Sequence, residues 1–188
     1  MKEHPILFNS EMVRAILDGR KTQTRRLVKP QPWWVADPSV PFSTPDADPK
    51  GIIKSPFGTV GDRLWVRETW GQVSFGKPHH SLDCFYRADG DSSRVLKWHP
   101  SIHMPRWASR INLEITAVRV ERVQDITEED AIKEGVNGGC LNCGVKAPCG
   151  CSMPRPDFRD GFAFLWQSIY DNWDTNPWVW VYTFRRVK

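Results

Sequence analysis

Apolar residues recur with the spacing of an α-helix in three short stretches of the chain. In the first stretch, Val13, Ile16 and Leu17 fall on one face. Asn9 and Ser10 can cap its start, and Gly19 stands where a left-handed residue commonly ends a helix. In the second, Thr127 followed by acidic residues is typical of a capping box. These patterns predict helices over residues 10–18, 128–134 and 160–172.

Elsewhere, apolar and polar residues alternate one by one, which is typical of strands. Between residues 63 and 70, Leu64, Val66 and Glu68 share one face, so Glu68 is expected to point inward. The same alternation predicts strands over residues 84–87, 111–120 and 178–187. Strands mixed with short helices indicate an α+β fold with a mainly antiparallel sheet or a small barrel.

Other segments carry neither pattern. Residues 28–61 contain seven prolines and are expected to form a long irregular loop, and residues 137–156 form an insertion rich in Cys, Gly and Pro. The basic polar stretch over residues 20–26 is expected to be irregular chain as well. A length of 188 residues is consistent with a single domain, residues 1–188, that carries both irregular segments.

Composition narrows the class of protein. Hydrophobic residues make up 40% and charged residues 26%, as in soluble globular proteins. The chain has no apolar run of about 18 residues and residues 1–8 do not form a signal peptide, so a cytoplasmic protein without a membrane span is expected. A net charge of +4 permits a nucleic-acid partner, and ten tryptophans offer surfaces for a core or for stacking on bases.

The most informative segment follows the first predicted helix. Residues 19–24 read Gly-Arg-Lys-Thr-Gln-Thr, and two arginines come directly after them. A helix followed by Gly-x-Lys-Thr-x-Thr and basic residues resembles the signature of the ASCH domain, a relative of the PUA RNA-binding domain. Further matches follow in the family's order at residues 61–66, 111–124, 125–134 and 178–185. The Arg-Glu-Thr-Trp run at residues 67–70 resembles the form found in phage and prophage ASCH proteins.

This resemblance implies both a fold and an activity. ASCH domains have a PUA-like, mixed and mainly antiparallel β-barrel with a few short helices. One branch consists of small amidohydrolases that deacetylate N(4)-acetylcytidine, and its catalytic residues match Lys21, Thr24 and Glu134 of this chain. A phage-encoded member would act in the host cytoplasm. Other branches are reported or proposed as ribonucleases or as modules that bind RNA or a modified base without turnover, and both remain alternatives here.

The residue types also fit amide hydrolysis on chemical grounds. A hydroxyl such as that of Thr24 becomes a useful nucleophile when a neighbouring base takes its proton. Lys21 can be that base if desolvation and nearby cations depress its pKa. Glu134 could orient Lys21 or protonate the leaving amine. Glu68 is a second candidate for the acid, because a buried carboxylate needs a cationic partner; the cations considered for it are Arg25, Arg26 and Lys21.

Basic and aromatic residues around these positions are candidates for binding a nucleoside, a modified base or RNA. They are Arg20, Arg25, Arg26, Arg67 and Trp70. The ring of Trp70 would stack on the base, and the arginines would face phosphate or the base edge. For the basic loop that follows the first helix, the alternative is a solvated turn without a role in binding, and for Trp70 the alternative is an aromatic residue of the 28–61 loop.

Four of the five cysteines lie within the twelve residues 140–151. An odd number of cysteines, crowded together in a chain expected to be intracellular, argues against a disulfide framework. Four thiolates are the ligand set that tetrahedral Zn²⁺ prefers in structural sites. The sequence therefore predicts one structural zinc held by Cys140, Cys143, Cys149 and Cys151, and no organic cofactor; the alternative is a reduced insertion without metal.

Overall fold

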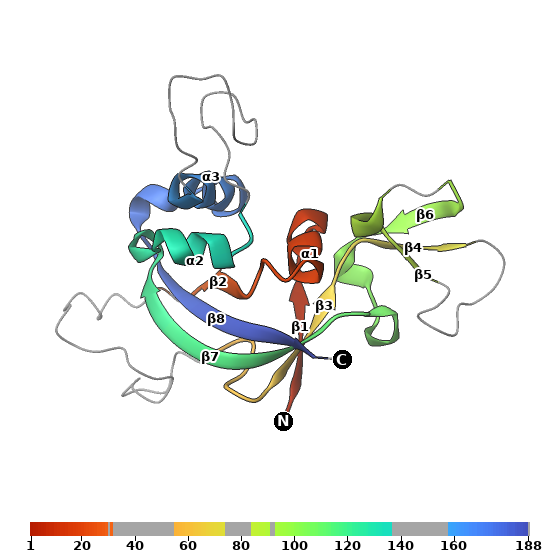
Figure 1. Ribbon diagram of the computed structural model, residues 1–188, viewed down its shortest axis with the longest axis horizontal. Coiled ribbons are helices and arrows are strands. Elements are labelled where there is room, and N and C mark those ends of the chain that lie inside the picture. Colours follow the sequence, from red (N-terminus) through yellow and green to blue (C-terminus); the bar gives the residue numbers. More distant parts are fainter. Residues whose placement is uncertain (30, 32–54, 74–83, 91–92, 137–157, 188) are drawn as a thin grey trace, which may run out of the picture. The chain divides into compact units, whose positions relative to one another are not determined.

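The computed structural model describes residues 1–29, 31, 55–73, 84–90, 93–136 and 158–187. The chain divides into two compact units. The first unit contains Met1–Gly19, Pro56–Thr116 and Phe184–Lys188, and the second contains Arg20–Ser55 and Ala117–Thr183. Two long strands, β7 (Asn112–Arg122) and β8 (Trp178–Val187), contribute residues to each unit (Figure 1).

In the first unit, β1 (Glu3–Leu7) pairs in parallel with β3 (Arg63–Arg67), and β3 pairs antiparallel with the first residues of β7. The helix α1 (Ser10–Leu17) belongs to this unit. A separate antiparallel sheet has the order β5-β4-β6, formed by β4 (Trp70–Val73), β5 (Cys84–Tyr86) and β6 (Val95–His99). Short 3-10 turns cover Arg87–Asp89, Ser101–His103 and Arg106–Ala108.

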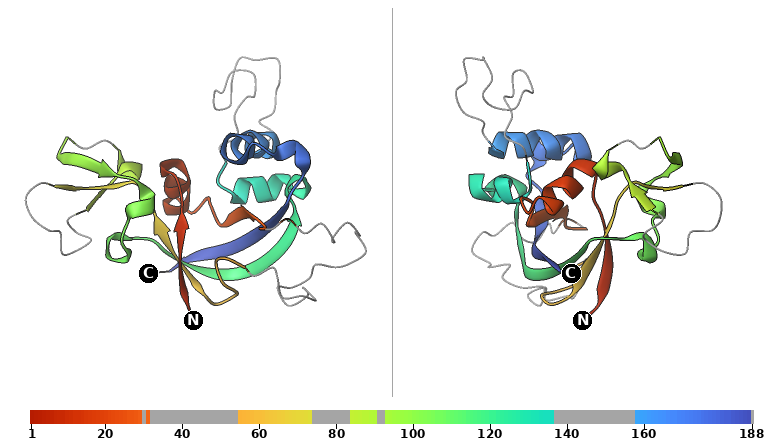
Figure 2. Two further views of the ribbon diagram at one scale, coloured as in Figure 1. Left: turned by 180° about the vertical axis from the view of Figure 1, so that it is seen from behind. Right: turned by 45° about the vertical axis from the view of Figure 1, so that its right-hand side comes forward.

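In the second unit, β2 (Gln23–Leu27) pairs antiparallel with β8, from Gln23 opposite Thr183 to Leu27 opposite Val179. The helices α2 (Glu128–Lys133) and α3 (Phe158–Tyr170) lie side by side in all three views (Figures 1 and 2). Short 3-10 turns cover Val123–Asp125 and Trp173–Thr175. Strand by strand, the larger sheet has the order β1-β3-β7-β8-β2.

The helix ends follow the signals that predicted them. The side chain of Asn9 accepts the Met12 N–H at 2.8 Å and begins α1, and the hydroxyl of Thr127 accepts the Asp130 N–H at 3.2 Å and begins α2. Gly19 has a φ of 75°, in the left-handed region that glycine reaches without strain. Both helices therefore start and stop for local reasons that are visible in the sequence.

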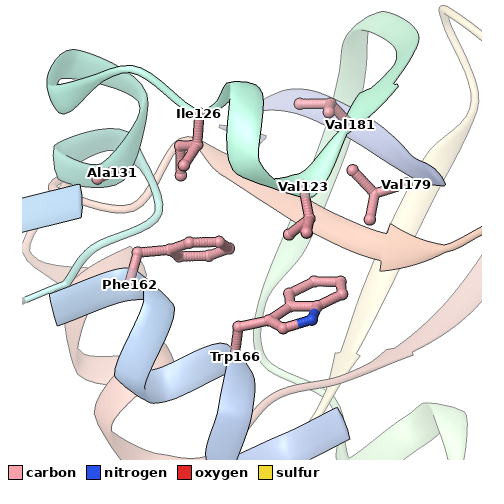
Figure 3. Packing of buried hydrophobic residues seen from close by; sticks show 7 residues of the cluster. All are labelled: Val123, Ile126, Ala131, Phe162, Trp166, Val179 and Val181. Carbon is pink, nitrogen blue, oxygen red and sulfur yellow. The ribbon is translucent and has the colours of Figure 1, made fainter. Parts of the chain in front are cut away.

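The core of the second unit forms between the helices and the strand β8. Phe162 and Trp166 point from α3 toward the apolar side chains around them (Figure 3). The buried members of this cluster are Val123, Ile126, Ala131, Phe162, Trp166, Val179 and Val181. Burial of each large side chain contributes about 1.5–3 kcal/mol, so this cluster fixes α2 and α3 on one face of β8.

The expected α+β class, with mainly antiparallel sheets and a few short helices, is confirmed. The three predicted helices are present with ends shifted by one or two residues. Leu64, Val66 and Glu68 are all buried, as their alternation predicts. The strands predicted over residues 84–87, 111–120 and 178–187 correspond to β5, β7 and β8.

Four strands were not predicted from the sequence patterns: β1, β2, β4 and β6. The strand predicted over residues 63–70 ends at Arg67 as β3, and Trp70 begins the separate strand β4. The strand β2 corrects a prediction as well. The stretch 20–26, expected to be irregular, contains most of β2, whose polar residues pair through their backbone with β8. The strands β1 and β6 were not predicted, because each offers too few alternating apolar residues. Within the described chain, the strands form two sheets and no closed barrel.

Several sequence-based expectations fall on chain outside the described residues. They concern most of the irregular loop 28–61 and the whole Cys-rich insertion 137–156. In the part of the chain that the structure does describe, no helix has the length and apolar character needed to cross a bilayer.

Candidate functional site

The Gly-x-Lys-Thr-x-Thr segment connects α1 to β2 and lies against the end of α2. The Thr22 N–H donates to the carbonyl oxygen of Lys133 at 2.8 Å, which ties the segment to the last turn of that helix. A guanidinium nitrogen of Arg20 lies 3.4 Å from the carbonyl oxygen of Gly135, one residue past the helix cap. These backbone contacts place Lys21 beside Glu134.

Lys21 and Glu134 form a buried ion pair. The Lys21 Nζ donates to the Glu134 Oε2 at 2.7 Å and to the Glu134 carbonyl oxygen at 2.8 Å. The Lys21 side chain is 0% exposed and that of Glu134 only 4%. The structure thus brings together two residues that the sequence separates by 113 positions.

Arg25 holds the same carboxylate from its other side. Its Nη1 donates to the Glu134 Oε1 at 3.1 Å and to the Gln23 Oε1 at 3.3 Å. Its Nε and Nη2 donate to the Glu121 Oε1 at 3.0 and 2.5 Å, and Nη2 also donates to the Asp130 Oδ2 at 3.0 Å. All five N–H donors of the guanidinium therefore have acceptors within the protein.

Further ion pairs surround Arg25. Arg119 donates to the Glu121 Oε2 at 2.8 Å and to the Asp130 Oδ2 at 2.5 Å. We call the whole set the Arg25 network; its members are Arg25, Arg119, Glu121, Asp130 and Glu134. Arg119, Glu121 and Asp130 were not predicted from the sequence. Arg119 and Glu121 lie on a strand and Asp130 on a helix, where charged residues are usually solvent-exposed, and none of the three belongs to a recognisable motif.

Burial and neighbouring charge act together on the two central cations. Burial lowers the pKa of Lys21, and the positive charges of Arg26 and Arg25 lower it further, while Glu134 opposes them. Burial acts to lower the pKa of Arg25 too, but the carboxylates of Glu134 and Glu121 prevail and raise it. Lys21 is therefore the group of this site that can lose its proton, and Arg25 stays charged.

Thr24 lies within β2, where its backbone is opposite Tyr182 of β8. It is buried, with 3% of its surface exposed. Because side chains alternate along a strand, Thr24 shares a face with Arg26, and Arg25 projects from the other face. Lys21 precedes the strand, so the alternation does not fix its direction.

Glu68, the second acid predicted from the sequence, belongs to the first unit. It is buried, and the cation that it contacts is Arg110, whose Nε and Nη2 donate to its two oxygens at 2.9 and 3.1 Å. Arg110 also donates to Asp89 at 2.7 and 2.8 Å and lies over the Tyr86 ring at 3.9 Å. Burial raises the pKa of Glu68, and Arg110 opposes that rise.

The residues expected to bind substrate have diverse surroundings. The Arg25 side chain is 0% exposed, and Arg26 is partly buried next to it in the chain. In the first unit, Arg67 donates to the carbonyl oxygen of Ile102 and lies over the Trp65 ring. Of the four arginines Arg20, Arg25, Arg26 and Arg67, Arg20 is the one whose side chain is exposed to solvent.

The Trp70 ring, expected to stack on a base, is already covered within the first unit. It is 5% exposed, stacks on His99 with ring centroids 4.9 Å apart and meets the edge of Trp107 at 5.7 Å. A base could stack on Trp70 only if one of these two rings moved away.

The predicted zinc ligands, residues 140, 143, 149 and 151, lie outside the described chain. Among the residues that are described, no three His, Cys, Asp or Glu side chains are grouped so as to hold a metal ion.

Comparison of the chain with protein-family models, with curated proteins and with solved structures finds no match.

Proposed function

We propose that the chain is an amidohydrolase that acts on an N-acylated cytidine or a related modified nucleoside or base. Lys21 serves as the general base, Thr24 as the nucleophile and Glu134 as the acid that orients Lys21. The observation that carries the proposal is the buried ion pair between Lys21 and Glu134, which involves the lysine of the Gly-x-Lys-Thr-x-Thr segment. The resemblance to the ASCH family, with its PUA-like barrel, supplies the substrate class and belongs to the same proposal.

The environment of Lys21 supports a role as base. An exposed lysine is protonated at neutral pH and cannot accept a proton. Burial lowers the pKa of Lys21 and so increases the fraction of free amine. Two contacts with Glu134 hold the Nζ in place. A solvated lysine in a mobile turn would have neither property.

The proposed reaction has two steps. Lys21 takes the proton of the Thr24 hydroxyl, the oxygen attacks the acyl carbon, and the bond from that carbon to the exocyclic nitrogen breaks. The leaving amine takes the proton from Lys21, so cytidine and an acyl ester of Thr24 are formed. Water then attacks the ester with Lys21 again accepting a proton, and the free acid leaves as Thr24 is restored.

The mechanism makes one geometric demand. The Lys21 Nζ and the Thr24 hydroxyl must come within about 2.6–3.2 Å of each other when substrate is bound. In the structure the Lys21 Nζ contacts Glu134, so the proposal requires this side chain to turn toward Thr24, three positions away, when substrate binds.

Incubation of the purified protein with a panel of N-acylated cytidines and with RNA, followed by mass spectrometry, tests the proposal. We expect release of the acyl group as free acid and of the unmodified nucleoside. Binding of an acylated cytidine without release of acid would replace the hydrolase by a module that reads modified bases. Shortened RNA products would replace it by a ribonuclease.

A further inference from the structure

Arg25 was a candidate for binding substrate, but its surroundings point to another role. Its side chain is 0% exposed, and each of its five N–H donors already has an acceptor in the protein. A substrate phosphate or base edge would have to displace one of these buried carboxylates. That exchange would leave a buried charge without a partner, which is costly.

The two oxygens of Glu134 are divided between two cations. Arg25 donates a hydrogen bond to Oε1 at 3.1 Å, and Lys21 donates one to Oε2 at 2.7 Å. Arg25 contacts Glu134 through Nη1 alone. The direction of this donor is fixed because the other nitrogens of the planar guanidinium are bound by Glu121 and Asp130. Glu121 and the ring of Phe162, 5.7 Å away, hold the guanidinium itself.

We propose that Arg25 is a positioning residue: by holding Oε1 of Glu134 it directs Oε2 to Lys21. Arg25 further places a permanent positive charge beside Lys21, which favours the free amine. The contacts and charges around Arg25 exist without substrate, so its positioning role does not require hydrolase activity. Only the kinetic effect of this role rests on the proposed function.

The charged groups that face Lys21 determine the sign of the effect. Glu134, at the end of α2, favours the ammonium form of Lys21, and the two arginines of β2, Arg25 and Arg26, disfavour it. Behind Arg25 lie Asp130 of α2 and, from β7, Glu121 and Arg119, while α3 contributes only the apolar ring of Phe162. Removal of the Arg25 charge leaves the carboxylates less compensated, so Lys21 should hold its proton more tightly.

Titration of Lys21 by NMR in Arg25→Gln tests this directly. The side-chain signals of Lys21 are followed from pH 6 to pH 11 in the wild type and in the variant, with Lys21→Met used to assign them. We expect the midpoint to rise by about one pH unit or more in Arg25→Gln, as is typical for loss of an adjacent charge. An equal midpoint in the two proteins, a lower one in the variant, or no titration in either would overturn the proposal.

Two further variants keep the test decisive. If Arg25→Gln does not fold, the double variant Arg25→Gln/Glu121→Gln removes both charges of the buried pair. It should still show an upward shift, but a smaller one, because loss of the Glu121 carboxylate partly offsets loss of the Arg25 charge. Arg25→Lys, which keeps a positive charge, should return the midpoint toward that of the wild type. A midpoint in Arg25→Lys as high as in Arg25→Gln would contradict the charge effect.

Kinetics separate positioning from binding. A positioning role predicts that Arg25→Gln leaves KM unchanged and shifts the pH profile of kcat/KM to higher pH. At neutral pH, kcat/KM should fall by about tenfold, since the fraction of free amine falls tenfold for each unit by which the pKa of Lys21 rises. A binding role predicts a higher KM with an unmoved profile. If the wild type releases no acid from acylated cytidines, the proposed function fails, and the NMR titration still decides the role of Arg25.

Discussion

Lys21 is a lysine whose side chain has no exposed surface, and Glu134 balances its charge inside the protein. Breaking such a pair by removing one partner usually costs about 3–5 kcal/mol, because the other charge remains buried alone. Glu134 pairs with two buried cations, Lys21 and Arg25, so its loss affects both, whereas Glu134 keeps its contact with Arg25 when Lys21 is lost. Loss of the glutamate is therefore expected to be the more damaging change.

The first prediction concerns this asymmetry. Glu134→Gln should lower the free energy of unfolding by about 3 kcal/mol, and Lys21→Met by less. The double variant Lys21→Met/Glu134→Gln should lose less than the sum of the two, since residues in direct contact are not additive. Urea unfolding of the four proteins measures all these values. Strict additivity would mean that the pair contributes no coupling energy.

A second prediction follows from the lowered pKa of Lys21. Between its folded pKa and the unfolded value of about 10.4, the unfolded chain binds more protons than the folded chain. The free energy of unfolding of the wild type should therefore rise with pH in this window relative to that of Lys21→Met. Urea unfolding of both proteins at several pH values up to about pH 10 checks the sign. A difference that is flat or falls with pH contradicts a lowered pKa.

The third prediction tests the nucleophile. Thr24→Val removes the hydroxyl and keeps the shape, so kcat should fall by about 10²–10⁴-fold, the range lost with general-base assistance. Lys21→Met should be as damaging, and the combination of both changes little worse, because the residues act as one unit. Thr22→Val, two positions away, is the matched control and should retain kcat. A Thr24→Val enzyme with normal turnover would remove Thr24 from the mechanism.

At the scale of elements, the site depends on two short segments, β2 and α2. The six residues of α2 form less than two turns, and isolated helices of this length are marginal in water. The cap at Thr127 and the packing of Ala131 in the apolar cluster stabilise this helix. Since Glu134 caps its far end, any fraying of α2 moves the carboxylate that Lys21 and Arg25 share.

The fourth prediction therefore concerns the cap of α2. Thr127→Ala removes the hydroxyl that accepts the Asp130 N–H and should lower the free energy of unfolding by about 1 kcal/mol. If α2 holds Glu134 in place, kcat/KM should fall as well. Thr59→Ala, at an exposed position of the first unit, is the control and should change neither quantity. Unchanged stability of Thr127→Ala would show that the cap contributes little.

At the scale of the whole molecule, each of the two compact units contains a buried carboxylate held by an arginine. In the second unit Arg25 holds Glu134, and in the first unit Arg110 holds Glu68. Both arginines also contact a second acid, Glu121 and Asp89 respectively, and each guanidinium lies over an aromatic ring. In both units, therefore, an arginine that also contacts a second acid and an aromatic ring neutralises the buried carboxylate.

The fifth prediction concerns the cysteines outside the described residues. We expect one zinc per chain in protein purified without added metal, measured by elemental analysis. Cys143→Ser should lose the zinc while the circular dichroism of the protein persists, because a structural zinc stabilises chiefly the segment that carries its ligands. Cys84→Ser, which changes the partly buried cysteine of β5, should keep the metal. Zinc content near zero with four freely titratable thiols contradicts this prediction.

Local signals determined the helices and the apolar strands from the sequence alone. Asn9, Thr127 and Gly19 act through bonds to residues only a few positions away, so their patterns are readable without a structure. The alternation of Leu64, Val66 and Glu68 likewise predicted a buried face. The resemblance to a family also indicated Lys21 and Thr24, in the Gly-x-Lys-Thr-x-Thr segment, and Glu134, on the later helix, as candidates.

Only the tertiary structure decided how the polar residues are arranged. The strand β2 has no apolar alternation: Arg25 is buried through ion pairs with distant residues, and Gln23 is buried beside it and accepts a hydrogen bond from its guanidinium. Arg25 and Glu121 are 96 positions apart, and nothing local distinguishes either from a surface charge. Glu68 found its partner in Arg110, 42 positions away. Pairing energies of this kind arise from three-dimensional proximity and desolvation, which no one-dimensional pattern records.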